Sequence, residues 1–145
     1  MNPVEQILVG TLPPGLYRLT NAPNADYLME PLVRHGWRGF YIDGTVVKDK
    51  DSFLRIAAAA MEFPLYFGHN WDAFEECVTD LAWAPAKGYV LLYDGVFHFA
   101  RRDRAAWRTA RSILADAVTH WQTAGKPFYV LLRNTWWYAH DLEKV

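Results

Sequence analysis

The sequence predicts an α/β fold in which helices pack on a small, mainly parallel β-sheet. Two short apolar runs, YVLLY at 89–93 and FYVLL at 128–132, are continuous rather than alternating, which is typical of strands covered on both faces. Between them, Trp107, Ala110 and Leu114 begin a series of apolar residues at steps of three and four, the period of a helix. Strand, helix and strand together form a βαβ unit with parallel strands.

The rest of the chain supplies further elements of the same fold. One long helix is expected over 101–125, because this segment ends in a glycine suited to a helix C-terminus. A third core strand is expected at 39–43, where an Asp-Gly turn signal follows. Nearer the N-terminus, 15–19 is a possible fourth strand and 24–36 a possible helix, which an internal proline would kink or shorten.

Two more helices are expected between the third core strand and the first apolar run. Residues 50–62 form one of them, with Asp51 or Ser52 as the N-cap and a proline beyond its end. Residues 71–83 form the other, with Asn70 as the N-cap and a proline just past its end. The expected sheet therefore has three core strands and a possible N-terminal strand.

A single domain is the expected organisation of these 145 residues. The formal net charge of −1 creates no overall field that would attract nucleic acid or an anionic membrane. The single cysteine excludes an intramolecular disulfide and favours a reducing compartment. No signal-peptide pattern or membrane-length apolar run is present. The sequence therefore predicts a soluble, cytoplasmic protein without a membrane span.

The helix expected over 71–83 has an acidic face. Four carboxylates share one side of its helical projection: Asp72, Glu75, Glu76 and Asp80. Its apolar residues lie on the other side, among them Cys77, which we expect to be a buried, inert thiol. No Lys or Arg occurs between positions 56 and 86, so the acids lack i,i+4 partners and repel one another. The face is either merely solvated or, as its unpaired acids and the aromatic residues before it favour, a docking surface for a basic partner.

The loop and this helix also carry a motif. The chain contains YFGHNWDAFEECVT at 66–79, with an aromatic pair, Gly, Asn, Asp-Ala, an acid, Cys and Thr at set spacing. This pattern resembles the signature of the barstar family of ribonuclease inhibitors, and the order of elements extends the resemblance, more weakly, over 37–133. The resemblance implies one domain over 1–145, in which the core follows an N-terminal extension, 1–36, and precedes a tail, 134–145.

The resemblance implies a function for the acidic helix. In the barstar family, this helix and the loop before it enter the active-site cleft of a ribonuclease, where carboxylates take the places of substrate phosphates. A barnase-type ribonuclease or a related nuclease toxin is thus the implied partner, for which the protein would act as an antitoxin or immunity protein. No catalytic residue, cofactor or metal is implied.

Individual roles follow from the same resemblance. Asp72 and Glu76 would present the phosphate-mimicking carboxylates, with Glu76 standing where the family has an aspartate. Glu75, in place of a family aromatic, and Asp80 would add steering charge, and Thr79 would add a hydrogen bond. The loop that enters the cleft would be shaped by three residues: Tyr66, Gly68 and Asn70.

Two other functions remain open. One is nucleic-acid binding through the arginine stripe 101–111, whose members lie at i, i+3, i+7 and i+10: Arg101, Arg104, Arg108 and Arg111. A solvated face paired locally with Asp103 is the expected interpretation of this stripe, so we expect no direct binding of nucleic acid. The other is an interaction or regulatory module that keeps the fold for a partner that is not a nuclease.

Three further groups of side chains have a defined expectation. His69, Asp72 and Glu76 have a spacing that would allow a shared metal, but the absence of a second His at helical spacing argues against one. Trp83 projects near the acidic side and is a candidate interface residue. The tail segment Trp136-Trp137-Tyr138 either caps the sheet or forms an exposed apolar patch.

Overall fold

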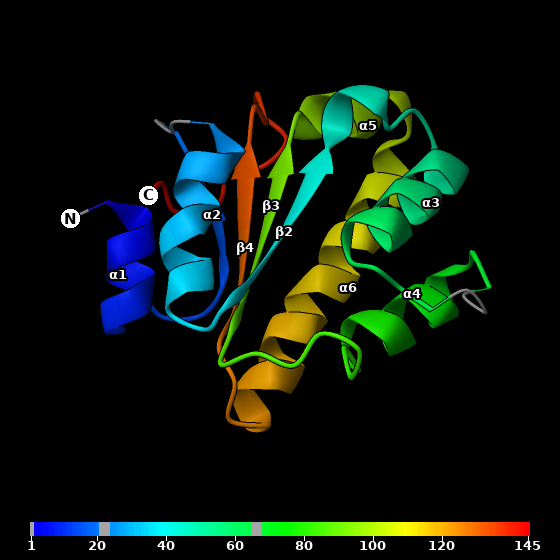
Figure 1. Cartoon of the computed structure of the whole chain (residues 1–145). Helices are drawn as coiled ribbons and strands as arrows, with labels where there is room; N and C mark the ends of the chain where they lie inside the picture. Colours follow the sequence, from blue (N-terminus) through cyan, green and yellow to red (C-terminus); the bar gives the residue numbers. More distant parts are fainter. Residues whose placement is uncertain (1, 21–23, 65–67) are drawn as a thin grey trace.

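The computed structural model describes residues 2–20, 24–64 and 68–145. It contains a four-stranded, all-parallel sheet with helices on both faces (Figure 1), which confirms the predicted fold class and its N-terminal strand. The strands run in the order β1-β4-β3-β2 across the sheet. Their bounds are β1 Leu16–Arg18, β2 Arg38–Asp43, β3 Tyr89–Asp94 and β4 Phe128–Arg133.

Burial explains the different patterns of the strands. The first five residues of β3 and of β4 are all buried, because these two strands occupy the centre of the sheet and are covered on both faces. In the edge strand β2, Phe40 and Ile42 are buried while Tyr41 and Asp43 are exposed. Continuous apolarity thus marks the centre of this sheet, and alternation marks its edge.

The helices divide into two layers (Figure 1). On one face lie α1 (Pro3–Val9) and α2 (Ala25–Arg34), which form an apolar core with β1 and one side of β3 and β4. The larger core on the other face is formed with α3, α4, α5 and α6, whose bounds are Lys50–Ala60, Trp71–Val78, Val96–Arg102 and Arg104–Thr123. A short 3-10 turn, η1 (Gly44–Val46), joins β2 to the loop before α3.

The expectation for the start of the helix over 50–62 was wrong. Its N-cap is Asp49, not Asp51 or Ser52: the Asp49 carboxylate accepts a hydrogen bond from the Ser52 amide (2.8 Å), and the Ser52 hydroxyl accepts one from the Asp49 amide (3.0 Å). This reciprocal pair is a capping box. Three candidate capping residues within four positions (Asp49, Asp51 and Ser52) made the N-cap ambiguous, and the capping box between Asp49 and Ser52 decides it.

The single helix expected over 101–125 is in fact two helices. Asp103 leaves the helical conformation (φ −146°, ψ 84°) and its carboxylate caps α6 by accepting a hydrogen bond from the Ala106 amide (3.0 Å). The preceding helix, α5, was not predicted, because Gly95 starts it without any side-chain cap. At the other end, Gly125 adopts a left-handed conformation (φ 84°) just after α6, as expected.

The C-terminal tail returns beside β1, where the Val145 amide donates to the Arg18 carbonyl (2.8 Å) and the Arg18 amide donates to the Glu143 carbonyl (2.9 Å). The helix expected over 24–36 is α2, which contains Pro31 inside it. The division of the single domain into extension, core and tail stays a prediction. Among the described residues, no helix is long and apolar enough to cross a membrane.

Candidate functional site

The acidic helix α4 begins at the predicted N-cap. The Asn70 side chain accepts a hydrogen bond from the Ala73 amide (2.8 Å) and donates one to the Gly68 carbonyl (3.3 Å). It therefore fixes both the first turn of the helix and the end of the loop before it. Gly68, His69 and Asn70 are all exposed. Tyr66, the predicted aromatic contact, lies outside the described residues.

One side of α4 is anchored in the core. Phe74 is fully buried and packs edge-on against Phe53, with ring centroids 5.3 Å apart. Half-buried Trp71 also contacts the Phe53 ring (5.9 Å). At the C-terminal end, the indole N–H of Trp121 on α6 donates to the Val78 carbonyl (2.9 Å), satisfying one of the acceptors that a helix end leaves without an intrahelical partner. This packing holds the helix in a fixed orientation.

The other side of α4 presents the carboxylates to solvent. Asp72, Glu75 and Glu76 are exposed on the helix, and Asp80 is exposed two residues past its end. None of these four forms an ion pair with any residue that the structure describes. We call the four residues the acidic face. Their mutual repulsion is not relieved within the described part of the chain, so a cationic partner would relieve it.

The helix is shorter than expected, and this changes its last residues. It ends at Val78 rather than at 83, because Leu81 takes a left-handed conformation (φ 49°) while its side chain stays buried. The Thr79 hydroxyl donates to the Glu75 carbonyl (2.7 Å), so only its oxygen remains to accept a hydrogen bond from a partner. A helix end that reverses at leucine gives no glycine signal in the sequence.

Trp83 does not lie on the acidic face, contrary to expectation. Its indole N–H donates to the Met61 carbonyl (3.0 Å), and its ring packs edge-on against Phe63 (5.8 Å). The expectation extended the helical projection past the point where the helix ends. Cys77 is buried as predicted: burial raises the pKa of its thiol, and the carboxylates of Asp80 and Glu76 add to the effect.

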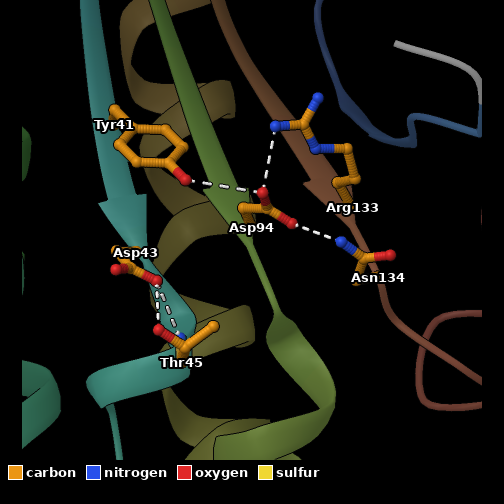
Figure 2. A network of polar contacts seen from close by, with 6 residues as sticks. All are labelled: Tyr41, Asp43, Thr45, Asp94, Arg133 and Asn134. Carbon is orange, nitrogen blue, oxygen red and sulfur yellow. Dashed lines mark hydrogen bonds and ion pairs between the residues drawn. The ribbon is translucent and has the colours of Figure 1, made fainter. Parts of the chain in front are cut away.

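The structure also shows a polar network that the sequence analysis missed. Figure 2 shows the Asp94 carboxylate accepting hydrogen bonds from Arg133 (3.0 Å), Asn134 (2.7 Å) and Tyr41 (3.4 Å) at the carboxyl ends of three strands. Burial opposes the ionisation of Asp94, but these hydrogen bonds and the Arg133 charge outweigh it, so its pKa is lowered. The signal available in the sequence was a polar residue after each apolar run, which the strand register brings together.

The remaining candidate groups are placed as follows. Arg104, Arg108 and Arg111 lie on α6, whereas Arg101 belongs to α5, so the predicted stripe is interrupted at Asp103.

Trp136 and Trp137 are exposed, so they form an apolar patch on the surface and do not cap the sheet. Tyr138 is partly buried against the larger core. Within 2–20, 24–64 and 68–145, no three His, Cys, Asp or Glu side chains are grouped to hold a metal.

Fold and site together define a small parallel α/β protein that presents an unpaired acidic helix face. The family described as Barstar (barnase inhibitor) matches residues 37–133, which is more than half of the chain and includes β2, α4 and β4. The chain therefore belongs to the barstar family, a family of inhibitors. A search of curated proteins finds no match.

Among solved structures, the chain is similar to the ORC2 protein of Aeropyrum pernix in its ADPNP-ADP complexes. The similarity covers 90% of this chain and 37% of that one, with a TM-score of 0.53 and 12% sequence identity. This chain thus spans little more than a third of the length of that protein. At this identity the likeness concerns the fold alone.

Proposed function

We propose that this protein inhibits a barnase-type ribonuclease, or a related nuclease toxin, by inserting α4 and the loop before it into the active-site cleft of the enzyme. The observation that carries the proposal is the acidic face. Its four carboxylates are exposed and form no ion pair with the described residues, and three of them lie on the helix that bears the family motif. The protein would act as a cytoplasmic antitoxin or immunity protein, without catalysis of its own and without a cofactor.

Asp72 and Glu76 would stand in for substrate phosphates. They lie four residues apart on α4, so their Cβ atoms are separated by about 5–6 Å on one side of the helix. Two carboxylates at this separation can engage different cationic side chains of one cleft. Where water is excluded, bidentate pairing between Arg and a carboxylate is among the stronger polar contacts.

The other residues of the site would support this contact. Glu75 and Asp80 add negative charge that speeds the encounter with a basic enzyme. Gly68 and Asn70, together with Tyr66, would shape the entering loop, and Thr79 would accept a hydrogen bond. Because the buried side of α4 is already ordered, the helix itself loses little conformational entropy on binding.

The test is a titration of the full-length protein into a barnase-type ribonuclease while RNA cleavage is followed at low and at physiological salt. Stoichiometric inhibition that weakens as salt rises is expected. The Asp72→Ala, Glu76→Ala double variant should lose inhibition while its circular dichroism and thermal unfolding stay unchanged. As a matched control, Asp26→Ala with Asp116→Ala removes two exposed carboxylates from α2 and α6 and should inhibit like the parent.

Each negative result has a distinct meaning. A folded Asp72→Ala, Glu76→Ala variant that still inhibits fully shows that the acidic face is not the inhibitory surface. A folded parent protein that inhibits none of a panel of basic ribonucleases and nuclease toxins overturns the proposed partner class itself.

A further inference from the structure

The C-terminal tail holds two tryptophans in the solvent. Trp136 is 51% exposed and Trp137 is 60% exposed. Trp136 stacks on Phe97 of α5, with ring centroids 4.2 Å apart and planes 7° from parallel, and the Trp137 ring follows at 5.3 Å. Phe97 thus covers one face of the Trp136 ring. An exposed cluster of large aromatic rings of this kind marks an interaction surface more often than a passive one.

Polar contacts fix the tail on both sides of this pair. Before it, Asn134 donates to the Asp94 carboxylate, as Figure 2 shows. After it, the Arg111 guanidinium on α6 donates two hydrogen bonds to the Asp141 carboxylate, at 3.0 and 2.5 Å. Trp136 itself has a left-handed backbone (φ 50°), a conformation that a bulky residue adopts only where its surroundings impose it. The indoles are therefore positioned in advance of any partner.

Arginines flank the same rings. Arg104 and Arg108 are exposed, four residues apart on α6, and neither forms an ion pair with any carboxylate in the described ranges. A cavity of about 170 Å³ lies between α6 and the tail, and its lining includes Arg104, Arg108, Arg111, Trp137 and His140. On α5, Arg101 is one helical turn beyond Phe97. Arginines thus line the same cavity as Trp137, and Arg101 follows the phenylalanine on which Trp136 stacks.

We propose that this region binds single-stranded nucleic acid, with bases stacking on the two indoles and phosphates held by the arginines. We call it the aromatic–arginine surface, defined by Phe97, Arg101, Arg104, Arg108, Trp136 and Trp137. Aromatic faces that accept bases, next to cations that track a backbone, are the combination by which proteins bind single strands without sequence preference. A duplex hides its base faces, so it would engage only the arginines.

The aromatic–arginine surface is separate from the acidic face. The end of α4 contacts α6 at Trp121, whereas the arginines lie at or before Arg111. These ten residues of helix span about 15 Å, and Figure 1 shows α4 and α5 beside opposite ends of α6. The two tryptophans also lie beyond 133, where the family match ends. The inference therefore does not rest on the proposed inhibition.

The test uses the full-length protein and a labelled oligouridylate of about twelve nucleotides, with fluorescence anisotropy at about 50 and 200 mM salt. We expect tighter binding to the single strand than to an RNA duplex of equal length, with quenching of tryptophan fluorescence. Trp136→Ala with Trp137→Ala should weaken binding at least about tenfold, while Trp136→Phe with Trp137→Phe should restore much of it. Arg104→Gln with Arg108→Gln should reduce the slope of log K against log salt by about 1.4.

Matched controls separate this surface from general charge effects. Arg34→Gln with Arg55→Gln removes two exposed cations from α2 and α3 and should leave binding nearly unchanged, as should Asp72→Ala with Glu76→Ala. Three results would overturn the proposal: no binding of the single strand at low salt by the folded parent, equal binding of the duplex, or equal binding of a polyglutamate peptide, which would indicate an acidic protein as the occupant. A fourth possible result is self-association of the protein that Asp72→Ala with Glu76→Ala abolishes. That result would also overturn the proposal, because it would identify a second copy of this chain as the occupant of the surface.

Discussion

The acidic face and the aromatic–arginine surface differ in how the chain builds them. Three of the four carboxylates belong to one eight-residue helix, and its cap, Asn70, is the residue next to it. The aromatic–arginine surface combines α5, α6 and a tail that begins some thirty residues after the α6 arginines. The first surface is local in sequence and the second is assembled by the fold. This difference determines which of them a sequence can predict.

The two surfaces also differ in charge, and the whole-chain total conceals this. The formal net charge of −1 sums 16 acidic and 15 basic residues over the chain, and it conceals an acidic face at α4 and a group of arginines on α5 and α6. Uniform neutrality would predict weak electrostatic interactions everywhere. Segregated charges instead allow one end of the molecule to attract cations and the other to attract anions. Net charge alone therefore excludes less than we expected from the sequence.

The largest effect is expected when the packing that anchors the acidic helix α4 in the core is removed. Phe74→Ala deletes a fully buried ring that packs on Phe53, and we expect the free energy of unfolding to fall by about 3–5 kcal/mol. Urea denaturation monitored by circular dichroism measures the change. Glu75→Ala, on the exposed side of the same helix, should stay within about 0.5 kcal/mol of the parent. A loss below about 1 kcal/mol for Phe74→Ala would contradict the packing of α4 described above.

The next largest effect is expected when one charge of the acidic face is removed without changing the shape of the side chain. Glu76→Gln should weaken inhibition of the target nuclease by about 2–3 kcal/mol, or roughly 30- to 150-fold, since it leaves a cation of the partner buried without its counter-charge. Close charge pairs in the barnase–barstar complex, whose inhibitor belongs to the same family, have coupling energies of about 1.5–7 kcal/mol, and the expected loss lies within that range. The inhibition constant is the measurement.

Two control variants show whether the loss of inhibition in Glu76→Gln is due to the missing charge at this position. Glu76→Asp keeps the charge and should retain most of the inhibition, and Glu143→Gln removes an exposed charge from the tail and should have no effect. Nucleic-acid binding should be the same in all three. Equal inhibition by Glu76→Gln and the parent would mean that this carboxylate does not face a cation in the complex.

The sequence predicted most of the fold because burial leaves a periodic pattern. The runs at 89–93 and 128–132 are the two central strands, and the helical period after Trp107 is α6. The features of the fold that the sequence analysis missed lack such a pattern. Nothing marks the start of α5, which has no side-chain cap, and Leu81 reverses the chain without a glycine.

The sites follow the same division. The acidic face was predictable because helical spacing alone places Asp72, Glu75 and Glu76 together. The network around Asp94 depends on strand register, and the exposure of Trp136 and Trp137 depends on where the tail folds. Neither register nor tail position is encoded in a short segment. The binding roles of the acidic residues remain predictions that the experiments above address.

A smaller effect is expected where the tail joins the sheet. Asp94→Asn removes the charge that Arg133 and Asn134 engage, and we expect it to cost about 1–2 kcal/mol of stability at pH 7. The pKa of Asp94 is lowered in the folded state, so this stabilisation is present above the unfolded-state pKa of about 3.9 and is lost as pH falls through the lower folded-state pKa. Urea unfolding of Asp94→Asn and of the parent, at about pH 7 and at about pH 3, measures the difference in the free energy of unfolding at each pH.

The difference between Asp94→Asn and the parent should therefore shrink in acid, because Asp94 then becomes protonated in the parent. Asp116→Asn, an exposed residue on α6, should match the parent at both pH values. A difference that grows in acid would contradict the lowered pKa. Inhibition by the acidic face, on the other side of α6, should be unchanged.

The smallest expected effect concerns the other anchor of the tail. Asp141→Asn weakens the ion pair with Arg111, whose partner carboxylate is 57% exposed. An exposed pair contributes at most about 1 kcal/mol and is screened by salt, so the loss of stability should be within that limit and smaller at high salt. Hydrogen exchange of residues 136–141 should nevertheless accelerate, since one of the two anchors is weakened. If α4 also exchanges faster or inhibition falls, the two surfaces are coupled through α6, and they are not the independent regions that their separation along this helix indicates.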